Sequence, residues 1–353
     1  MSGRKAIYNH HGSWLTDIKA TVNRTWKLNQ YGSAEFKMAI TDPKTTQVNL
    51  EYGNFIVCEH PKLPDWVGML VGQVWDNGII TVQANQAEYI METRITQRNQ
   101  TIEGSPGIVF STLITELWDA EDWNIVTPGT IFPDGEKLKR EYHFDSLYSK
   151  IVELSKDSKC DWWLEPYIDN TGKLTFLANW SEKRGRPMTK ILAEGKNIAL
   201  SPNTLRVQGK IVNKLRMFGD GATWHEKPVA SRNNKKSKDR FGPMFGAEYA
   251  PGVTKEELNA LADTRIKETA YQRNTFSIIA LDKRDTFNNL GMGNTGRLIL
   301  KTYGFKELED GIHQTRFGTD ATVRILQMAL DEGKSSVALV TDEETDVTTG
   351  DSE

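Results

Sequence analysis

The chain has 353 residues, of which 38% are hydrophobic and 26% charged, and this length predicts two to four domains with substantial cores. With 44 Lys and Arg against 47 Asp and Glu, the net charge of −3 argues against a protein that grips nucleic acid by its phosphates. No run reaches the roughly 18 apolar residues of a membrane span, and no secretory signal or membrane anchor is predicted. Cys58 and Cys160 are predicted to be buried free thiols.

Residues 1–94 are predicted to form a first small β-barrel domain. The expected strands are Ala34–Ile40, Phe55–Cys58, Val67–Val74 and Ile79–Ala84, with a tight hairpin at Asp76–Gly78. Short strands of this kind have to pair or close in order to hide their edges, and this requirement favours a barrel.

Residues 95–186 are predicted to form an α+β domain. Ser105 followed by Pro106 marks the start of a helix, because Ser is a good N-cap and Pro suits the first turn. A second helix is expected to begin with Asp145 as its cap. A hairpin is expected around Asp169–Gly172.

A second, similar β-barrel domain is predicted from residues 187–225 and 273–340. It is expected to contain strands at Lys196–Leu200 and Thr204–Phe218. The predicted class is therefore α+β, mainly β, with two similar small β-barrel domains flanking an α+β domain.

Residues 226–272 are predicted to be an insertion, made of a loop and a helix, before the second set of barrel strands. The basic run 232–240 is interpreted as a solvated, mobile loop, although it could contact phosphate or an acidic partner surface. The capping box Thr254–Glu257 predicts the start of a helix. The acidic residues 341–353 are predicted to be a flexible tail.

Two stretches set 240 positions apart share one pattern. A strand, a turn, a Leu, a Gly-Asn turn and a second strand follow one another at the same spacing in both. The shared residues are Phe36, Asp42, Leu50, Gly53 and Asn54 in the first stretch and Phe276, Asp282, Leu290, Gly293 and Asn294 in the second. The spacing predicts a duplicated β-domain. The residues predicted to hold the two cores are Phe36, Ile40, Leu50, Phe276, Leu290 and Leu298.

The residues indicate no enzyme, and no catalytic, cofactor-binding or metal-binding residue is predicted. Gly291–Gly296 matches the glycine pattern of a dinucleotide-binding loop, but it precedes a predicted strand rather than a helix, so a β-turn is favoured. The six histidines show no metal-ligand spacing, and no nucleophile motif appears.

Three passages carry a resemblance to a known family. They are Trp26–Ile40 with its Leu-x-x-Gly-x-Phe-like pattern, Phe55–Val57 with Trp66–Val74, and Tyr142–Ser155 with Trp162–Pro166 and Lys173–Phe176. They resemble the opening hairpin, the out-and-back strands and the middle helix-plus-hairpin of the tail hub family of tailed bacteriophages. The resemblance covers most of residues 5–340.

This resemblance implies a structural virion protein at the distal end of a phage tail, in the tail tip or baseplate, assembled in the host cytoplasm. It implies a homotrimeric ring that continues the tail tube, with viral DNA passing through its lumen without specific binding. The implied partners are a distal tail or tail tube protein, a tape measure protein, and tail fibre or spike proteins. Two similar domains per chain would let three chains match a sixfold tube.

Two alternatives remain open at this point. One is a carbohydrate-binding tail-tip module that reads host glycans through exposed Trp and Tyr. The other is a glycan hydrolase that uses a pair of carboxylates. Its candidates are Asp119, Glu121 and Asp122, or Asp282 with Asp285.

Overall fold

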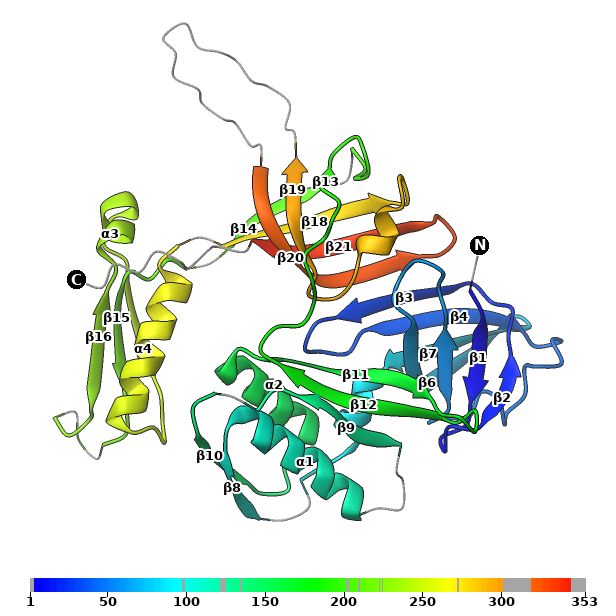
Figure 1. Cartoon of the computed structure of the whole chain (residues 1–353), viewed down its shortest axis with the longest axis horizontal. Coiled ribbons are helices and arrows are strands. Elements are labelled where there is room, and N and C mark those ends of the chain that lie inside the picture. The colour runs from blue at the N-terminus through cyan, green and yellow to red at the C-terminus, as the bar shows by residue number, and fades with distance from the viewer. Residues whose placement is uncertain are drawn as a thin grey trace, which may run out of the picture. The chain divides into compact units, whose positions relative to one another are not determined.

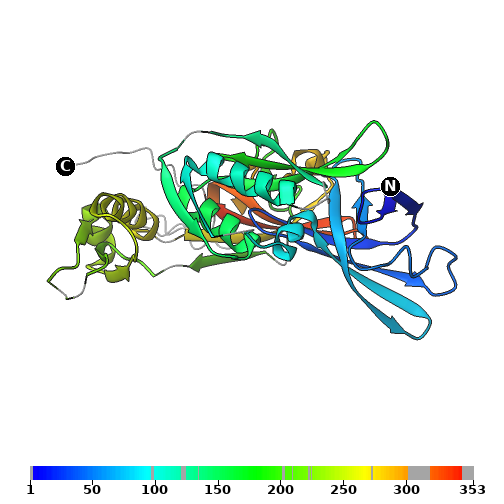
Figure 2. The same cartoon turned by 90° about the horizontal axis from the view of Figure 1, so that it is seen from below.

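The computed structural model describes residues 3–96, 99–120, 125–133, 135–200, 203–208, 210–221, 223, 225–271, 273–300 and 319–343 (Figures 1 and 2). The chain divides into two compact units. The larger unit comprises Met1–Asn203 with Ile278–Thr341, and the smaller comprises Thr204–Ser277 with Asp342–Glu353. The predicted α+β, mainly β class is confirmed. No helix in the described ranges is both long and apolar enough to cross a membrane.

The first β half of the chain forms seven strands. They are β1 (Lys5–Tyr8), β2 (Trp14–Asp17), β3 (Val22–Lys27), β4 (Ser33–Ala39), β5 (Phe55–Cys58), β6 (Trp66–Asp76) and β7 (Ile79–Gln86). They pair in the order β3-β4-β7-β6-β5-β1-β2. The predicted hairpin between β6 and β7 is confirmed, because Asn77 and Gly78 both have positive φ, as a two-residue type I′ turn requires.

The second β half repeats this arrangement. Its elements are β13 (Leu192–Ala193), β14 (Thr204–Gln208), β18 (Arg273–Leu281), η2 (Thr286–Asn289), β19 (Thr295–Leu300), β20 (Thr319–Asp331) and β21 (Ser336–Glu343). They pair in the order β14-β18-β21-β20-β19-β13. Five of its strands have a counterpart in the first half: β14 corresponds to β3, β18 to β4, β21 to β7, β20 to β6 and β19 to β5. Strand β13 differs, because it pairs with β19 in parallel whereas β1 pairs with β5 antiparallel.

The repeat extends to individual hydrogen bonds. Residues 53–54 form a Gly-Asn turn in which the Gly N–H donates to the Leu70 carbonyl over 3.0 Å, while the Leu70 N–H donates to the Asn carbonyl over 2.7 Å. Residues 293–294 make the same two bonds with Ile325, each over 2.9 Å. Both glycines have positive φ, 90° and 76°, a conformation that glycine adopts at little cost. The repeated spacing in the sequence therefore corresponds to equivalent turns and equivalent hydrogen bonds in the structure.

The two copies do not form separate barrels. Strand β20 pairs with β3, so one open 13-stranded sheet contains both halves, and its described strands close no barrel. The core prediction is confirmed for Phe36, Leu50, Phe276, Leu290 and Leu298, which are all at most 3% exposed. It is wrong for Ile40, which is 44% exposed because it lies beyond the end of β4, at the hairpin tip where its N–H donates to Gly78.

The middle of the chain is an α+β part of the larger unit. Its elements are η1 (Ala87–Thr93), β8 (Gln100–Gly104), α1 (Pro106–Ala120), β9 (Val126–Ile131), β10 (Leu138–Tyr142), α2 (Leu147–Ser158), β11 (Asp161–Ile168) and β12 (Leu174–Ser181). The helix start at Pro106 and the hairpin around Gly172 are confirmed. The cap of α2 is Ser146 rather than Asp145, because the Ser146 hydroxyl accepts from Ser149 N at 3.3 Å.

Besides β14 and the start of β18, the smaller unit contains a three-stranded sheet and two helices. Its elements are β15 (Lys214–Phe218), β16 (Val229–Asn233), α3 (Lys235–Phe241), β17 (Phe245–Tyr249) and α4 (Lys255–Thr269). The capping box that opens α4 is confirmed.

Two sequence predictions near the smaller unit are wrong. The basic run 232–240 is not a mobile loop, because Asn234 caps α3 and the hydroxyl of buried Ser237 donates to the Ala270 carbonyl. Instead of a strand over 196–200, residues 195–197 form a turn and Ile198 makes isolated bridges with Ala280 and Glu194, and the strand expected over 204–218 is broken between β14 and β15.

Candidate functional site: strand junctions and the polar sheet face

The two halves of the sheet join where β20 pairs with β3 in antiparallel register. Met328 lies opposite Trp26, and Leu330 lies opposite Arg24. Both β20 side chains are buried, Met328 at 0% and Leu330 at 3% exposure. The junction therefore covers an apolar strip of β20 that β19 does not reach, since β19 pairs only with residues 319–324.

Glu332, at the end of β20, holds this junction by charge. Its carboxylate lies 3.0 Å from the Lys5 ammonium and 3.7 Å from the Arg24 guanidinium, and accepts a hydrogen bond from Val22 N at 2.8 Å. Burial alone would raise the pKa of Glu332, but the Val22 N–H and the Lys5 ammonium outweigh it, and the pKa is lowered. The ionised carboxylate is thus the favoured form at the junction.

The segment of β20 that pairs with β3 has a counterpart on β6. Among the described residues, no strand of the same chain covers this counterpart. Because Leu70 and Ile325 make equivalent bonds, Trp75 stands at the position of Leu330. Strand β6 pairs with β5 only through Trp66–Met69, so residues 72–76 have β7 on one side and no described strand on the other. Trp75 is 62% exposed where Leu330 is 3% exposed.

The counterpart of β3 is equally uncovered. Val22 pairs with Phe36 in the first half, and Leu205 pairs with Phe276 in the second, so β14 occupies the place of β3. Strand β14 ends the sheet, and its outer edge has no partner strand among the described residues. The chain therefore contains one completed junction, between β20 and β3. It also contains the two strands equivalent to that pair, β6 and β14, each with an open edge.

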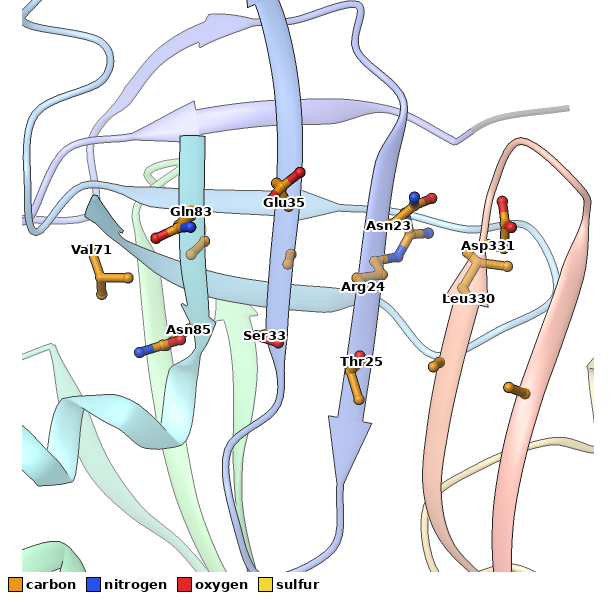
Figure 3. A pocket seen from close by; sticks show the side chains of 14 residues that line it. Asn23, Arg24, Thr25, Ser33, Glu35, Val71, Gln83, Asn85, Leu330 and Asp331 are labelled. Carbon is orange, nitrogen blue, oxygen red and sulfur yellow. The ribbon is translucent and has the colours of Figure 1, made fainter. Parts of the chain in front are cut away.

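A polar face covers the sheet around the completed junction. Figure 3 shows side chains of β3, β4 and β7 directed to this face, where they line a hollow of about 600 Å³. Asn23, Glu35 and Gln83 form one cross-strand row, since Asn23 pairs with Glu35 and Glu35 with Gln83. The carboxylates of Glu35 and Asp331 also line the hollow, and the neighbouring side chains are mostly small or uncharged.

A buried ionic cluster ties the middle part of the larger unit to both halves of the sheet. Asp161, at the start of β11, accepts hydrogen bonds from Arg324 of β20, from Arg184 N at 2.6 Å and from Asn29 Nδ2 at 2.9 Å. Asn29 belongs to the turn between β3 and β4. The side chain of Asp161 is only 3% exposed, so this carboxylate depends on these donors for its charge.

Glu88 is a second buried acid beside this cluster. Burial raises the pKa of its carboxyl to about 7, while the backbone N–H groups and Arg184 oppose that rise. Its Oε1 accepts from Leu164 N at 3.3 Å, and its Oε2 has no hydrogen-bond partner. The native state therefore favours the protonated acid more strongly than the unfolded chain does.

This raised pKa predicts a pH-dependent stability. Between pH 4.5, the ordinary value, and about 7, the folded protein binds more protons than the unfolded one, so the free energy of unfolding falls as the pH rises. The interval corresponds to about 3 kcal/mol. We expect Glu88→Gln to gain about that much relative to the natural protein between pH 4.5 and 8 in urea unfolding. Glu35→Gln, on the exposed polar face, is the control, and an equal gain there would contradict this explanation.

The structure describes one of the two carboxylate groups that the sequence raised as hydrolase candidates. Asp282 and Asp285 both bind Lys62, at 2.7 Å and 2.9 Å, so one ammonium neutralises the pair. Asp119, Glu121 and Asp122 have side chains outside the described residues. The turn predicted at Gly291–Gly296 is confirmed, and it leads into β19. Cys58 and Cys160 are buried free thiols, as predicted.

Sequence reasoning missed the residues that define the junctions. Trp75 lies on β6, Arg324 lies on β20, and Glu332 directly follows β20. The pattern recognised in the sequence ended at the first strand after each Gly-Asn turn. A second spacing could have extended it: 255 positions separate Leu70 from Ile325, and the same interval separates Trp75 from Leu330.

No protein-family model matches the sequence, and no curated protein matches it. Solved structures of phage tail proteins do match the fold. The prophage tail protein gp18 of Listeria monocytogenes EGD-e has a TM-score of 0.64 at 12% identity, covering 98% of this chain and 95% of that one. The 43 kDa tail protein of prophage MuSo2 from Shewanella oneidensis has a TM-score of 0.61 at 10% identity, covering 96% and 98%.

A tail protein from Neisseria meningitidis MC58 has a TM-score of 0.58 at 11% identity, covering 96% of this chain and 97% of that one. The chain therefore has the fold of phage tail proteins over nearly its whole length. The resemblance of its sequence to tail hub proteins is confirmed in the fold. The identities are too low to transfer the role of any residue.

Proposed function

We propose that this protein is a structural, non-catalytic hub of a phage tail tip, in which three chains form a ring that continues the tail tube. The observation that carries the proposal is the unfinished second junction. Within one chain β20 pairs with β3, whereas the equivalent strands β6 and β14 each present an open edge. Pairing of β6 with β14 of the next chain would repeat the internal junction between subunits.

Such an interface is heterologous, because two different edges meet, and a heterologous interface forms a closed ring when the rotation between neighbouring chains closes. Each chain contributes one internal junction and one junction with its neighbour. Three chains then provide six similar positions around the axis, which suits a sixfold tail tube. The pairing also buries Trp75 and hides two strand edges that would otherwise favour aggregation.

The polar face supports a conduit role. The carboxylates of Glu35 and Asp331 line its hollow together with the guanidinium of Arg24 and mostly small or uncharged side chains. Asp331 is paired with Lys334 over 3.0 Å and Arg24 is only 1% exposed, so this face, directed to the lumen, would offer little positive charge to hold passing DNA. Tail tube, distal tail, tape measure and fibre or spike proteins are the partners that this location implies.

The mass of the protein in solution tests the ring. We expect light scattering over a concentration series to show a species of about three times 39.9 kDa. A protein that stays at 39.9 kDa at the highest concentration, and forms no ring with a tail tube protein, would overturn the proposal.

A further inference from the structure

Residues 204–277, the part of the smaller unit that precedes the acidic residues 342–353, are basic in an otherwise acidic chain. Residues 204–277 contain 14 Lys and Arg against 8 Asp and Glu, whereas the whole chain has 44 against 47. This local excess of positive charge makes residues 204–277 attractive to an acidic partner.

One face of its sheet is covered by α4. Leu215 and Met217 of β15 point to that side, where they pack with Leu258 and Ala262 of the helix. Figure 1 shows α4 running along β15 and β16. Because side chains alternate along a strand, Lys214, Arg216 and Phe218 are directed to the opposite face.

The opposite face is basic and aromatic. Phe245 and Tyr249 of β17 are 67% and 54% exposed on it, and Arg216 lies exposed between them. Strand pairing places Lys214 beside Phe245, where its ammonium lies 4.9 Å from the ring centre. The ammonium of Lys227 lies 4.7 Å from the ring of Tyr249 in the same way. Cations held over rings at these distances keep their charge directed outward.

Strand β17 also presents an open backbone edge. It pairs with β15 on one side and ends the described three-stranded sheet on the other. The five residues Phe245–Tyr249 contain no lysine or proline, and the charge of their one acid, Glu248, is paired with Arg265 of α4 over 2.8 Å, so little on this edge blocks strand addition. An extended polypeptide can pair with this edge, whereas nucleic acid has no backbone amides to offer.

We propose that β17 and the basic face beside it bind an extended, acidic segment of a neighbouring tail protein by strand addition. Backbone hydrogen bonds to β17 would hold the segment. Every second side chain of an added strand lies over the same face, so alternate carboxylates would lie on the face that carries Lys214 and Arg216, with β17 between them.

The test uses the full chain and a labelled ten-residue peptide of alternating Glu and Thr, followed by fluorescence anisotropy. We expect this peptide to bind and a Gln-Thr peptide to bind at least tenfold more weakly, because it lacks the charges. The Glu-Thr peptide with all backbone amides N-methylated keeps the charges but loses the N–H donors. We expect it to bind at least tenfold more weakly too. Equal binding by the N-methylated peptide would overturn strand addition.

Charge reversal locates the site on the sheet. Lys214→Glu with Arg216→Glu is expected to weaken the Glu-Thr peptide about tenfold, since two attractive contacts become repulsive. Lys255→Glu, on exposed α4, makes the same kind of charge change on a different element and should leave binding within twofold. An equal loss in both variants, or tighter binding of a ten-nucleotide oligo-dT than of the peptide, would overturn the proposal.

This proposal can fail separately from the ring. The proposed ring junction uses β6 and β14, and neither strand contains Lys214, Arg216 or any residue of β17. A monomeric variant with an altered β6 edge should therefore still bind the peptide with unchanged affinity. Loss of binding in that variant would contradict a site built within one smaller unit.

Discussion

Replacing Trp75 by Asp is expected to leave the protein folded and monomeric at concentrations where the natural protein forms its ring. Trp75 is 62% exposed in the single chain, but its counterpart Leu330 is 3% exposed because β3 covers it. Covering a large apolar side chain contributes about 1.5–3 kcal/mol. An Asp in its place would bring an unpaired charge into a dry junction.

The effect is large because a ring of three contains three such junctions. A loss of about 3 kcal/mol at each one lowers the ring's association constant by roughly a million-fold. Trp14→Asp is the matched control, since Trp14 is also exposed, at 52%, but lies on β2 at the far end of the sheet order. A Trp75→Asp protein that still sediments as a ring, or a Trp14→Asp protein that does not, would contradict the assigned junction.

Replacing Arg324 by Met is expected to lower the free energy of unfolding of the monomer by about 3–5 kcal/mol. The reason is the carboxylate of Asp161, which is 3% exposed and would keep its charge without its guanidinium partner. The backbone N–H of Arg184 and the amide of Asn29 would remain as its donors. Neutral donors stabilise a buried anion less than an ion pair does.

Urea unfolding in the Trp75→Asp background measures this change without a contribution from assembly. Adding Asp161→Asn to Arg324→Met removes the buried carboxylate charge that has lost its partner. The double variant should regain at least about 1 kcal/mol of the free energy of unfolding. A single-variant loss below about 1 kcal/mol, or no recovery in the double variant, would show that the cluster does not hold the middle part to the sheet.

The features that could be predicted from the sequence are turns and helix caps, which depend on residues only a few positions apart. Gly53 and Gly293 stand in turns that need positive φ, and Thr254 with Glu257 forms a capping box, so each is visible within a few residues. Ile40 fits the alternation of Phe36 and Met38, yet the strand ends at Ala39 and leaves it outside the core. Alternation of apolar residues cannot show at which residue the strand ends and its side chains stop being buried.

The remaining features depend on contacts across the chain. Pairing of β20 with β3 joins residues about 300 positions apart, and nothing in either strand alone names its partner. The basic run became a helix because Ser237 is bound by Ala270 and Asn213, which no local pattern shows. The open edges became visible only when the complete and incomplete junctions could be compared.

A cysteine cross-link tests the proposed junction most directly. Ala329 pairs with Thr25 within the chain, and the repeat transfers this pair to Val74 and Gln208 of the next chain. Oxidised Val74→Cys with Gln208→Cys should give covalent dimers and trimers in a denaturing gel, and each single variant should stay monomeric. Val74→Cys with Thr204→Cys, four residues out of register, should not cross-link. Cross-links in the mismatched pair alone, or in neither pair, would contradict the ring.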